Sequence, residues 1–247
     1  MTASNNYKNS ALNNITVVLC NTSHNGNIGA VARAMKTMGL YKLALVAPQI
    51  MPDDHSYALA SNARDVVENA LITDSLDEVL EHTTLQYALT ARKREFNNFL
   101  STPFECAPEI LSSISNAEKI AIVFGSERSG LTIEQLEKCN RMVTIPANPE
   151  YSSLNLAQAV QVIAYEICRQ FSGSIEHLKT ETIHKSTFAD NQGILSHVDK
   201  SLYNAGYYNN NNKNRDMVQR RLQNIIKKAN LTREEVDLIR GLLPKLL

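Results

Sequence analysis

The stretch NPEYSSLNLAQAVQVIAYE, residues 148–166, decides how the rest of the chain is interpreted. Its second half is an amphipathic helix, because Leu156, Val160 and Ile163 recur at a spacing of three or four residues. Its first half places Asn, Pro, Glu, Tyr and two Ser ahead of that helix, and Asn155 directly before Leu156. Such side chains either cap a helix or line a polar binding site. The other motifs of the sequence indicate whether this polar segment is only a cap or also part of a binding site.

Composition excludes several classes of protein. The 247 residues are 43% hydrophobic, which is enough for a sizeable core, and 25 basic residues balance 25 acidic ones. A basic surface for nucleic acid must therefore be local. The polar start and the absence of a long apolar run favour a cytoplasmic protein without a membrane span. Four scattered cysteines without a CxxC pair indicate neither a metal site nor a disulfide framework.

Six short apolar runs are predicted to be strands. They are nearly continuous in hydrophobicity, as expected for strands that are buried on both faces of a parallel sheet. Helical patterns lie between them, so we predict an α/β fold with a mainly parallel sheet and helices on both faces. The predicted strands are residues 15–20, 43–48, 69–73, 85–91, 119–125 and 142–147.

Helix ends are also visible in the sequence. Gly39 follows an apolar pattern over residues 28–38 and is predicted to end that helix. The segments 75–78 and 132–135 have the spacing of capping boxes, so a helix is expected to begin at each.

The pattern of apolar residues changes near residue 172, which predicts a second domain. Residues 172–193 show little periodicity and are predicted to be a linker, and three helical patterns follow, the last beginning at Thr232. The predicted organisation is a flexible N-terminus, an α/β domain, the linker and a helical domain, at residues 1–13, 14–171, 172–193 and 194–247.

Polar and glycine-rich segments follow four of the predicted strands. They are NTSHNGN at 21–27, Thr90 with Ala91, FGSERSGL at 124–131, and the polar segment before Leu156. Each one alone has a simple structural explanation as a turn or a helix cap. Because the carboxyl ends of parallel strands meet at one edge of a sheet, their coincidence favours a ligand site. Neither GxGxxG nor GxxxxGK[ST] occurs at the first strand, and no clustered ligands suggest a metal.

Three motifs carry a resemblance to a known family. Residues 21–40, 124–131 and 145–166 closely resemble the motifs of the SPOUT superfamily of RNA 2′-O-methyltransferases, and are nearest to the TrmJ-type tRNA methyltransferases. The resemblance is strong over about residues 14–170 and weaker in the tail. It implies a trefoil knot in the final part of the α/β domain, S-adenosyl-L-methionine as cofactor, and 2′-O-methylation of a cytidine or uridine at nucleotide 32 of the tRNA anticodon loop.

The resemblance also implies roles for individual residues. Arg33 would lie at the reaction centre, often facing the cofactor of a partner subunit, accompanied by Asn27, Ser153 and Asn155. It implies a homodimer, for which the last helix of the α/β domain offers Tyr165 and Ile167 as contacts. The implied cofactor-binding residues are Leu89, Thr90, Ala91, Gly125, Ser126, Glu127, Ile145, Ser152, Ser153 and Leu154.

Local basic residues suggest where RNA would bind. The segment 213–228 contains Asp216 as its only acid, although a solvated helix face explains that pattern equally well. The predicted RNA-binding residues are Lys36, Arg92, Arg94, Arg220 and Arg221. Three other interpretations stay open at this point. They are a non-catalytic RNA-binding module with the knotted fold, a ribosomal RNA 2′-O-methyltransferase of the same superfamily, and an unrelated α/β nucleotide-binding protein.

Overall fold

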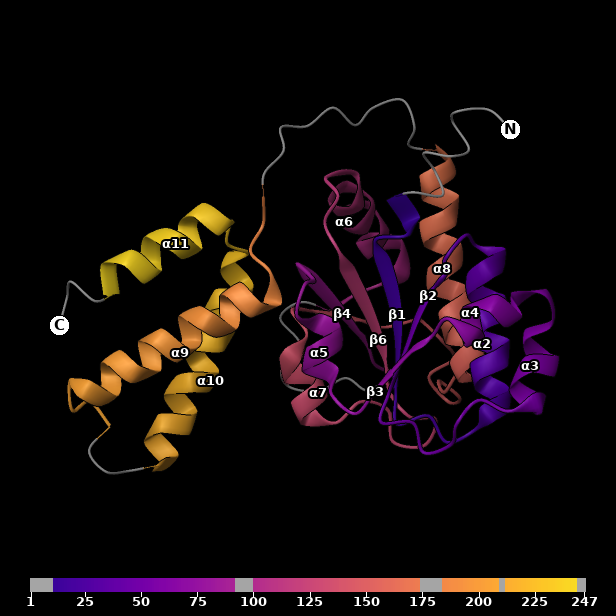
Figure 1. The fold of residues 1–247 in the computed structure, drawn as a ribbon, viewed down its shortest axis with the longest axis horizontal. Helices are drawn as coiled ribbons and strands as arrows, with labels where there is room; N and C mark the ends of the chain where they lie inside the picture. The colour runs from indigo at the N-terminus through magenta and orange to yellow at the C-terminus, as the bar shows by residue number, and fades with distance from the viewer. Residues whose placement is uncertain (1–10, 92–99, 174–183, 209–211, 244–247) are drawn as a thin grey trace. The chain divides into compact units, whose positions relative to one another are not determined.

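The computed structural model describes residues 11–91, 100–173, 184–208 and 212–243, without the side chains of 172–173 and 212–213. The chain divides into two compact units, Met1–Thr180 and Glu181–Leu247. Figure 1 shows that the first is an α/β unit built around one sheet and that the second consists of helices. Within these described ranges, no helix is long and apolar enough to cross a membrane. Most of the predicted N-terminal segment, 1–13, lies outside them.

A seven-stranded parallel sheet forms the centre of the first unit, with the order β3-β2-β1-β6-β4-β7-β5. All six predicted strands form, so the prediction of an α/β fold with a mainly parallel sheet is confirmed. Strand β5 was not predicted, because two residues are too few to show a periodicity. The strands are β1 (Ile15–Cys20), β2 (Lys42–Val46), β3 (Leu71–Thr73), β4 (Leu85–Leu89), β5 (Leu100–Ser101), β6 (Ile120–Phe124) and β7 (Arg141–Val143).

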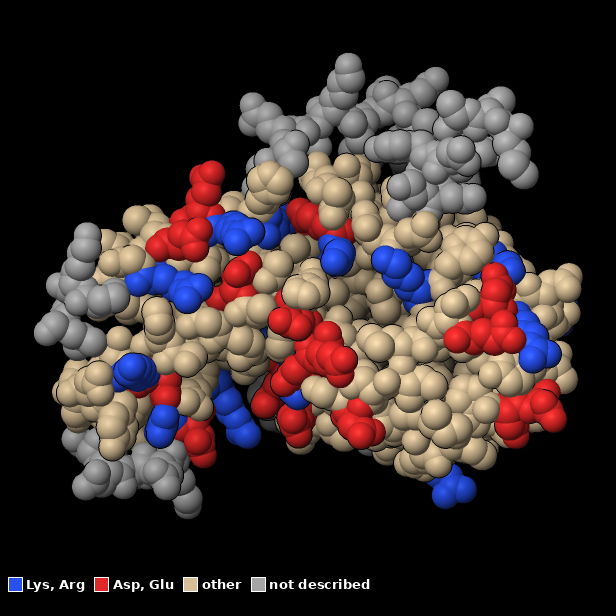
Figure 2. Space-filling model, viewed as in Figure 1, with Lys and Arg blue, Asp and Glu red and all other residues tan. Residues whose placement is uncertain are grey.

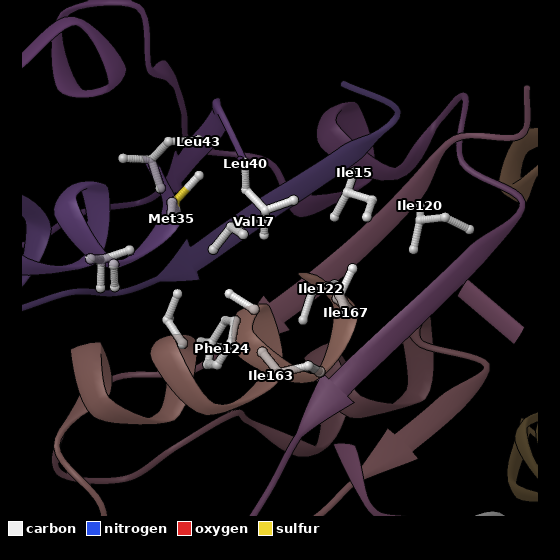
Figure 3. Packing of buried hydrophobic residues seen from close by; sticks show 14 of the residues in the cluster. Ile15, Val17, Met35, Leu40, Leu43, Ile120, Ile122, Phe124, Ile163 and Ile167 are labelled. Carbon is white, nitrogen blue, oxygen red and sulfur yellow. The ribbon is translucent and has the colours of Figure 1, made fainter. Parts of the chain in front are cut away.

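Helices cover both faces of this sheet. On one face, Val17 of β1 and Ile122 of β6 pack in the same apolar cluster as Ile163 (Figure 3). That face carries α2 (Asn25–Thr37), α6 (Pro103–Ser115) and α8 (Leu156–Gly173). Figure 1 shows α5 (Leu76–Leu80) and α7 (Ile133–Lys138) on the other side of the sheet. Burial on both faces explains why the strands are continuously apolar.

The first helix packs unusually close to its neighbours. Three short elements follow β2, namely α3 (Asp54–Ala60), the 3-10 helix η1 (Ser61–Ala63) and α4 (Arg64–Glu68). A Cβ atom on Gly29 of α2 would lie 2.0 Å from the carbonyl oxygen of Ser56 in α3, so a glycine is required there. Gly39 has a φ of +79° and its N–H donates to Lys36 O at 3.1 Å, which confirms it as the residue that ends α2.

One of the two predicted capping boxes in this unit forms and the other does not. At α7, the N–H of Gln135 donates to Thr132 Oγ1 at 3.1 Å and the N–H of Thr132 donates to Gln135 Oε1 at 2.9 Å. At α5, Ser75 makes no side-chain cap. The hydroxyl of Thr73 instead donates to Glu78 and accepts from the N–H of Ser75 at 3.1 Å. The carboxylate that should complete the box is therefore already engaged.

The second unit contains α9 (Phe188–Asn204), α10 (Asn212–Ala229) and α11 (Arg233–Leu242). Helix α9 begins at Phe188 and not at 194, because Thr187 and Asp190 form a capping box, with the N–H of Asp190 donating to Thr187 Oγ1 at 3.2 Å. The end of the segment predicted as linker is thus helical. The box predicted at Thr232 is confirmed. Phe188, Ile194, Tyr208 and Val236 are buried between the helices.

An ion pair joins α9 to α10. Asp199 accepts hydrogen bonds from Arg215 Nε and from the Tyr208 hydroxyl, both at 3.0 Å. The hydrogen bond from Arg215 is the main reason that the pKa of Asp199 falls from 3.8 to about 2. The folded state therefore gains stability from ionised Asp199 above about pH 4, and loses that contribution as the pH falls toward 2.

We therefore expect Asp199→Asn to lower the thermal unfolding midpoint by a few degrees at pH 7. The difference from the wild type should shrink between pH 4 and pH 2, where wild-type Asp199 becomes protonated. Thermal unfolding followed by circular dichroism at pH 7, 4 and 3 measures this. A difference that stays constant over that range would contradict the assignment.

Candidate active site

A cavity of about 300 Å³ lies at the carboxyl ends of β4, β6 and β7. This volume is at the lower end of the range for small-molecule sites. All ten residues that the family resemblance implies for cofactor binding line it. Sequence reasoning did not assign eight further lining residues to the cofactor, although most of them belong to the same motifs: Phe124, Arg128, Ser129, Gly130, Leu131, Val143, Leu156 and Ala159.

The loop after β6 is folded back on itself. Ser126 and Gly130 pair across it, with the N–H of Gly130 donating to Ser126 O at 2.9 Å. A Cβ atom on Gly125 would lie 2.0 Å from the carbonyl carbon of Gly130, and Gly130 itself has a φ of +69°. Gly125 therefore has no room for a side chain, and Gly130 has a backbone conformation that favours glycine, so the loop requires both.

The polar segment before α8 has two separate functions. The Asn155 side chain caps the helix, because Asn155 Oδ1 accepts from the N–H of Ala157 at 2.9 Å while Gln158 Oε1 accepts from the N–H of Asn155 at 3.3 Å. Asn148 forms its own turn, accepting from the N–H of Glu150 at 3.0 Å. The segment between them, residues 152–154, lines the cavity. Capping therefore uses the side-chain oxygen of Asn155 and leaves the two serines for a ligand.

A hydrogen-bond network joins the three motifs. Glu127 Oε2 accepts from the N–H of Ser23 at 3.1 Å and from its hydroxyl at 3.0 Å. Glu127 Oε1 accepts from Asn27 Nδ2 at 2.8 Å, and Asn27 Oδ1 accepts from Asn155 Nδ2 at 3.0 Å. Each amide has its oxygen and nitrogen committed to different partners, so both orientations are fixed. We call this set, Ser23, Glu127, Asn27 and Asn155, the motif network.

The carboxylate of Glu127 is held in its ionised form. Partial burial on its own would raise its pKa, but the hydrogen bonds from Asn27, from the backbone of its own loop and from Ser23 together lower it below the usual value of 4.5. Glu127 is therefore an acceptor at neutral pH, which the donors of Ser23 and Asn27 require.

Arg33, which the resemblance places at the reaction centre, does not line this cavity. Arg33 is exposed on α2, makes no hydrogen bond or ion pair with any residue that the structure describes, and is not among the residues that line the cavity. Lys36, one turn further along, donates to Asp65 Oδ1 at 2.7 Å, so its charge is used within the unit. Figure 2 shows basic and acidic side chains interspersed on the face in view.

The other predicted RNA-binding residues fall into two groups. Arg92 and Arg94 lie outside the described residues. Arg220 and Arg221 are exposed on α10, in the second unit.

The lining of the cavity suits S-adenosylmethionine. Leu89, Phe124 and Ile145 form apolar walls that fit the flat faces of an adenine. The loops that contain Thr90 and Ser152 add hydroxyl groups and backbone donors and acceptors for the adenine edge and for an amino-acid head group. The residues present therefore fit the cofactor that the motifs imply.

An α/β unit whose polar loops converge on a cavity at the carboxyl ends of parallel strands is a cofactor-binding domain. The SpoU rRNA Methylase family matches residues 14–165, and the chain belongs to that family.

Two relatives are similar over almost their whole length. The chain is 42% identical over 237 residues to the tRNA (cytidine/uridine-2′-O-)-methyltransferase TrmJ of Pectobacterium atrosepticum, covering 94% of this chain and 96% of the relative. It is 42% identical over 236 residues to TrmJ of Escherichia coli K12, covering 94% of each. The crystal structure of TrmJ from Z. mobilis ZM4 has a TM-score of 0.80 and 29% identity, and the match covers 94% of this chain and 98% of that one.

Substitutions at Asn155 separate capping from the motif network. Asn155→Ala removes both functions, and loss of the cap alone should cost about 1 kcal/mol of stability. Serine is a good N-cap but lacks the amide that donates to Asn27. We therefore expect Asn155→Ser to restore most of the thermal stability while cofactor affinity and turnover stay low.

Thermal unfolding and calorimetric titration with S-adenosylmethionine measure the two effects separately. If Asn155→Ser restored turnover together with stability, Asn155 would be a helix cap only.

Proposed function

We propose that this protein transfers the methyl group of S-adenosylmethionine to the ribose 2′-hydroxyl of a cytidine or uridine in tRNA. The observation that carries the proposal is the motif network, which joins three distant segments beside a cavity of suitable lining. Full-length similarity to proteins named tRNA (cytidine/uridine-2′-O-)-methyltransferase supports the substrate. Nucleotide 32 of the anticodon loop is the position that the motif resemblance implies.

The reaction needs positioning more than activation. When bound, the cofactor supplies a methyl group that is already activated by a sulfonium centre. The cavity loops, including Gly125 and residues 152–154, would hold it with its methyl group accessible to the RNA. Aligning donor and acceptor can supply roughly 7–11 kcal/mol of the barrier. The motif network contributes by fixing the three motif segments relative to one another.

Arg33 is assigned an electrostatic role. A guanidinium has five N–H donors and no acceptor, so it is poorly suited to remove the hydroxyl proton. It is well suited to bind the phosphate next to the target ribose and to stabilise negative charge that develops on the 2′-oxygen. The proton then leaves through that phosphate or through water. Because Arg33 does not line the cavity of its own chain, we infer that it serves the cavity of a second copy.

The test of the function is direct. The purified protein should methylate tRNA in the presence of S-adenosylmethionine, and mapping of ribose methylation should place the group on nucleotide 32. The same methyl group should be absent from tRNA of cells that lack the protein. Methylation of ribosomal RNA alone would overturn the proposal.

Arg33→Ala should lower the rate of methyl transfer at least a hundredfold and leave cofactor affinity within about twofold of wild type. The reason is that Arg33 is exposed and contacts neither the cavity nor the motif network. Single-turnover methylation and calorimetric titration give the two quantities. The matched control is Arg64→Ala, since Arg64 is an exposed arginine of the same unit that pairs with Glu68 at 2.7 Å. Equal loss of affinity and rate in Arg33→Ala would make Arg33 a structural residue.

The active species should be a homodimer with arginines exchanged between subunits. Tyr165 of α8 is half exposed and can contribute to the interface, whereas Ile167, also predicted as a contact, is buried in the core. Mixing Arg33→Ala with Asn155→Ala should restore activity, at most one working site per mixed dimer. Sedimentation and the activity of the mixture measure this, and a fully active monomer is the contradicting result.

A further inference from the structure

The end of α9 leaves two tyrosines in solvent. Tyr203 is 66% exposed and Tyr207 is 54% exposed, although the next residue, Tyr208, is buried. Gly206, with a φ of +72°, ends the helix, and the N–H of Tyr207 donates to Leu202 O at 3.0 Å. The turn is therefore fixed by backbone hydrogen bonds. Aromatic rings gain much free energy on burial, so two exposed rings beside a buried one are candidates for contact with a partner.

These rings are part of an ordered polar cluster. The Arg215 guanidinium carbon lies 5.8 Å from the centre of the Tyr203 ring and 5.7 Å from that of Tyr208. Asp199 holds this guanidinium through the ion pair described above. The Tyr207 ring meets Tyr208 edge to face, with centres 5.8 Å apart. Each exposed ring thus contacts a neighbour within the unit, Arg215 for Tyr203 and Tyr208 for Tyr207, which limits the freedom it would lose on binding a partner.

The charge of this unit indicates an anionic partner. Residues 181–247 contain eleven Lys and Arg against seven Asp and Glu, whereas the rest of the chain contains fourteen against eighteen. Arg220 and Arg221 are exposed on α10, the helix that also carries Arg215. Exposed aromatic rings with basic side chains on the same unit are the chemistry that recognises unpaired nucleotides, by stacking on the bases and pairing with the phosphates.

We propose that Tyr203 and Tyr207 form a stacking platform for unpaired bases of the RNA substrate. The platform rests on the proposed function in one respect, namely that RNA is the substrate. The phosphates of the same strand would be bound by basic residues of α10, including Arg220 and Arg221. The platform would thus bind the loop of a folded RNA by the faces of its bases, without reading their edges.

Leucine and phenylalanine variants distinguish stacking from simple apolar contact. Tyr203→Leu and Tyr207→Leu should each lower the affinity of the full chain for tRNA about tenfold, which corresponds to ~1.4 kcal/mol. The phenylalanine variants should stay close to wild type. Because stacking neutralises no phosphate, the leucine variants should keep the wild-type salt slope, whereas Arg221→Gln should flatten it by roughly 0.7–0.9 per lost contact. The matched control is Leu238→Ala, a side chain of the same unit that is 63% exposed.

A fluorescent reporter tests the contact directly. The chain has no tryptophan, so Tyr203→Trp introduces a single indole. A base that stacks on it should quench its fluorescence when tRNA is added, whereas the indole of Leu238→Trp should not respond. Turnover at saturating tRNA should be unchanged in Tyr203→Leu, with the loss confined to KM.

The outcomes separate this inference from the proposed function. Leucine variants that bind tRNA like wild type, together with an unquenched indole, would overturn the platform and leave the methyltransferase proposal intact. Leucine variants that become monomeric in sedimentation would show that the rings are contacts between copies, which also overturns it. Ring-dependent RNA binding without any ribose methylation would support the platform and refute the proposed function.

Discussion

The active-site region depends on one partly buried carboxylate, that of Glu127. It accepts hydrogen bonds from Ser23 and Asn27 and, through Asn27, determines the orientation of Asn155 at the start of α8. A carboxylate that is removed from water is stable only when donors replace the lost hydration. The segment after β1 and the loop after β6 must therefore come together for Glu127 to be satisfied, and Asn27 then joins the start of α8 to them. The same requirement assembles the walls of the cavity.

The order of the strands makes this convergence possible. β6 lies between β1 and β4, and β7 lies between β4 and β5, so segments far apart in the sequence end side by side at one edge. The N–H of Thr90 after β4 donates to Val143 O of β7 at 3.0 Å, which ties two cavity loops together. The trefoil knot implied by the motifs stays a prediction. What the sheet provides is a rigid edge on which polar loops can be placed without their own apolar core.

Much of this arrangement could be predicted from the sequence, for a physical reason. Strands such as β1 and β6 are buried on both faces and so are recognisable as apolar runs. The glycines at 125 and 130 mark a tight loop, where Gly125 leaves no room for a side chain and Gly130 has a positive φ. The pairing partners of polar side chains could not be predicted, because they depend on strand order. Glu127 was placed only on a cofactor loop, and the bond from Asn155 to Asn27 spans residues 128 apart. The spacing of Thr187 and Asp190 fits a capping box, but the residues around it show little periodicity, so a helix was not predicted to begin there.

The division of charge between the two units explains how a neutral chain can bind RNA. The α/β unit has an excess of acidic residues, and its lysine nearest to Arg33 is already paired with Asp65. It therefore offers little long-range attraction, and an exposed arginine such as Arg33 is useful there only when the RNA is already close. The excess of basic residues in the helical unit can provide that approach. The two units would then have different physical roles. The second would attract the RNA phosphates, and this attraction weakens as the salt concentration rises. The first would align the reacting groups through short-range contacts that depend little on salt. An enzyme built in this way would lose affinity at high ionic strength long before it lost the alignment of the reacting groups.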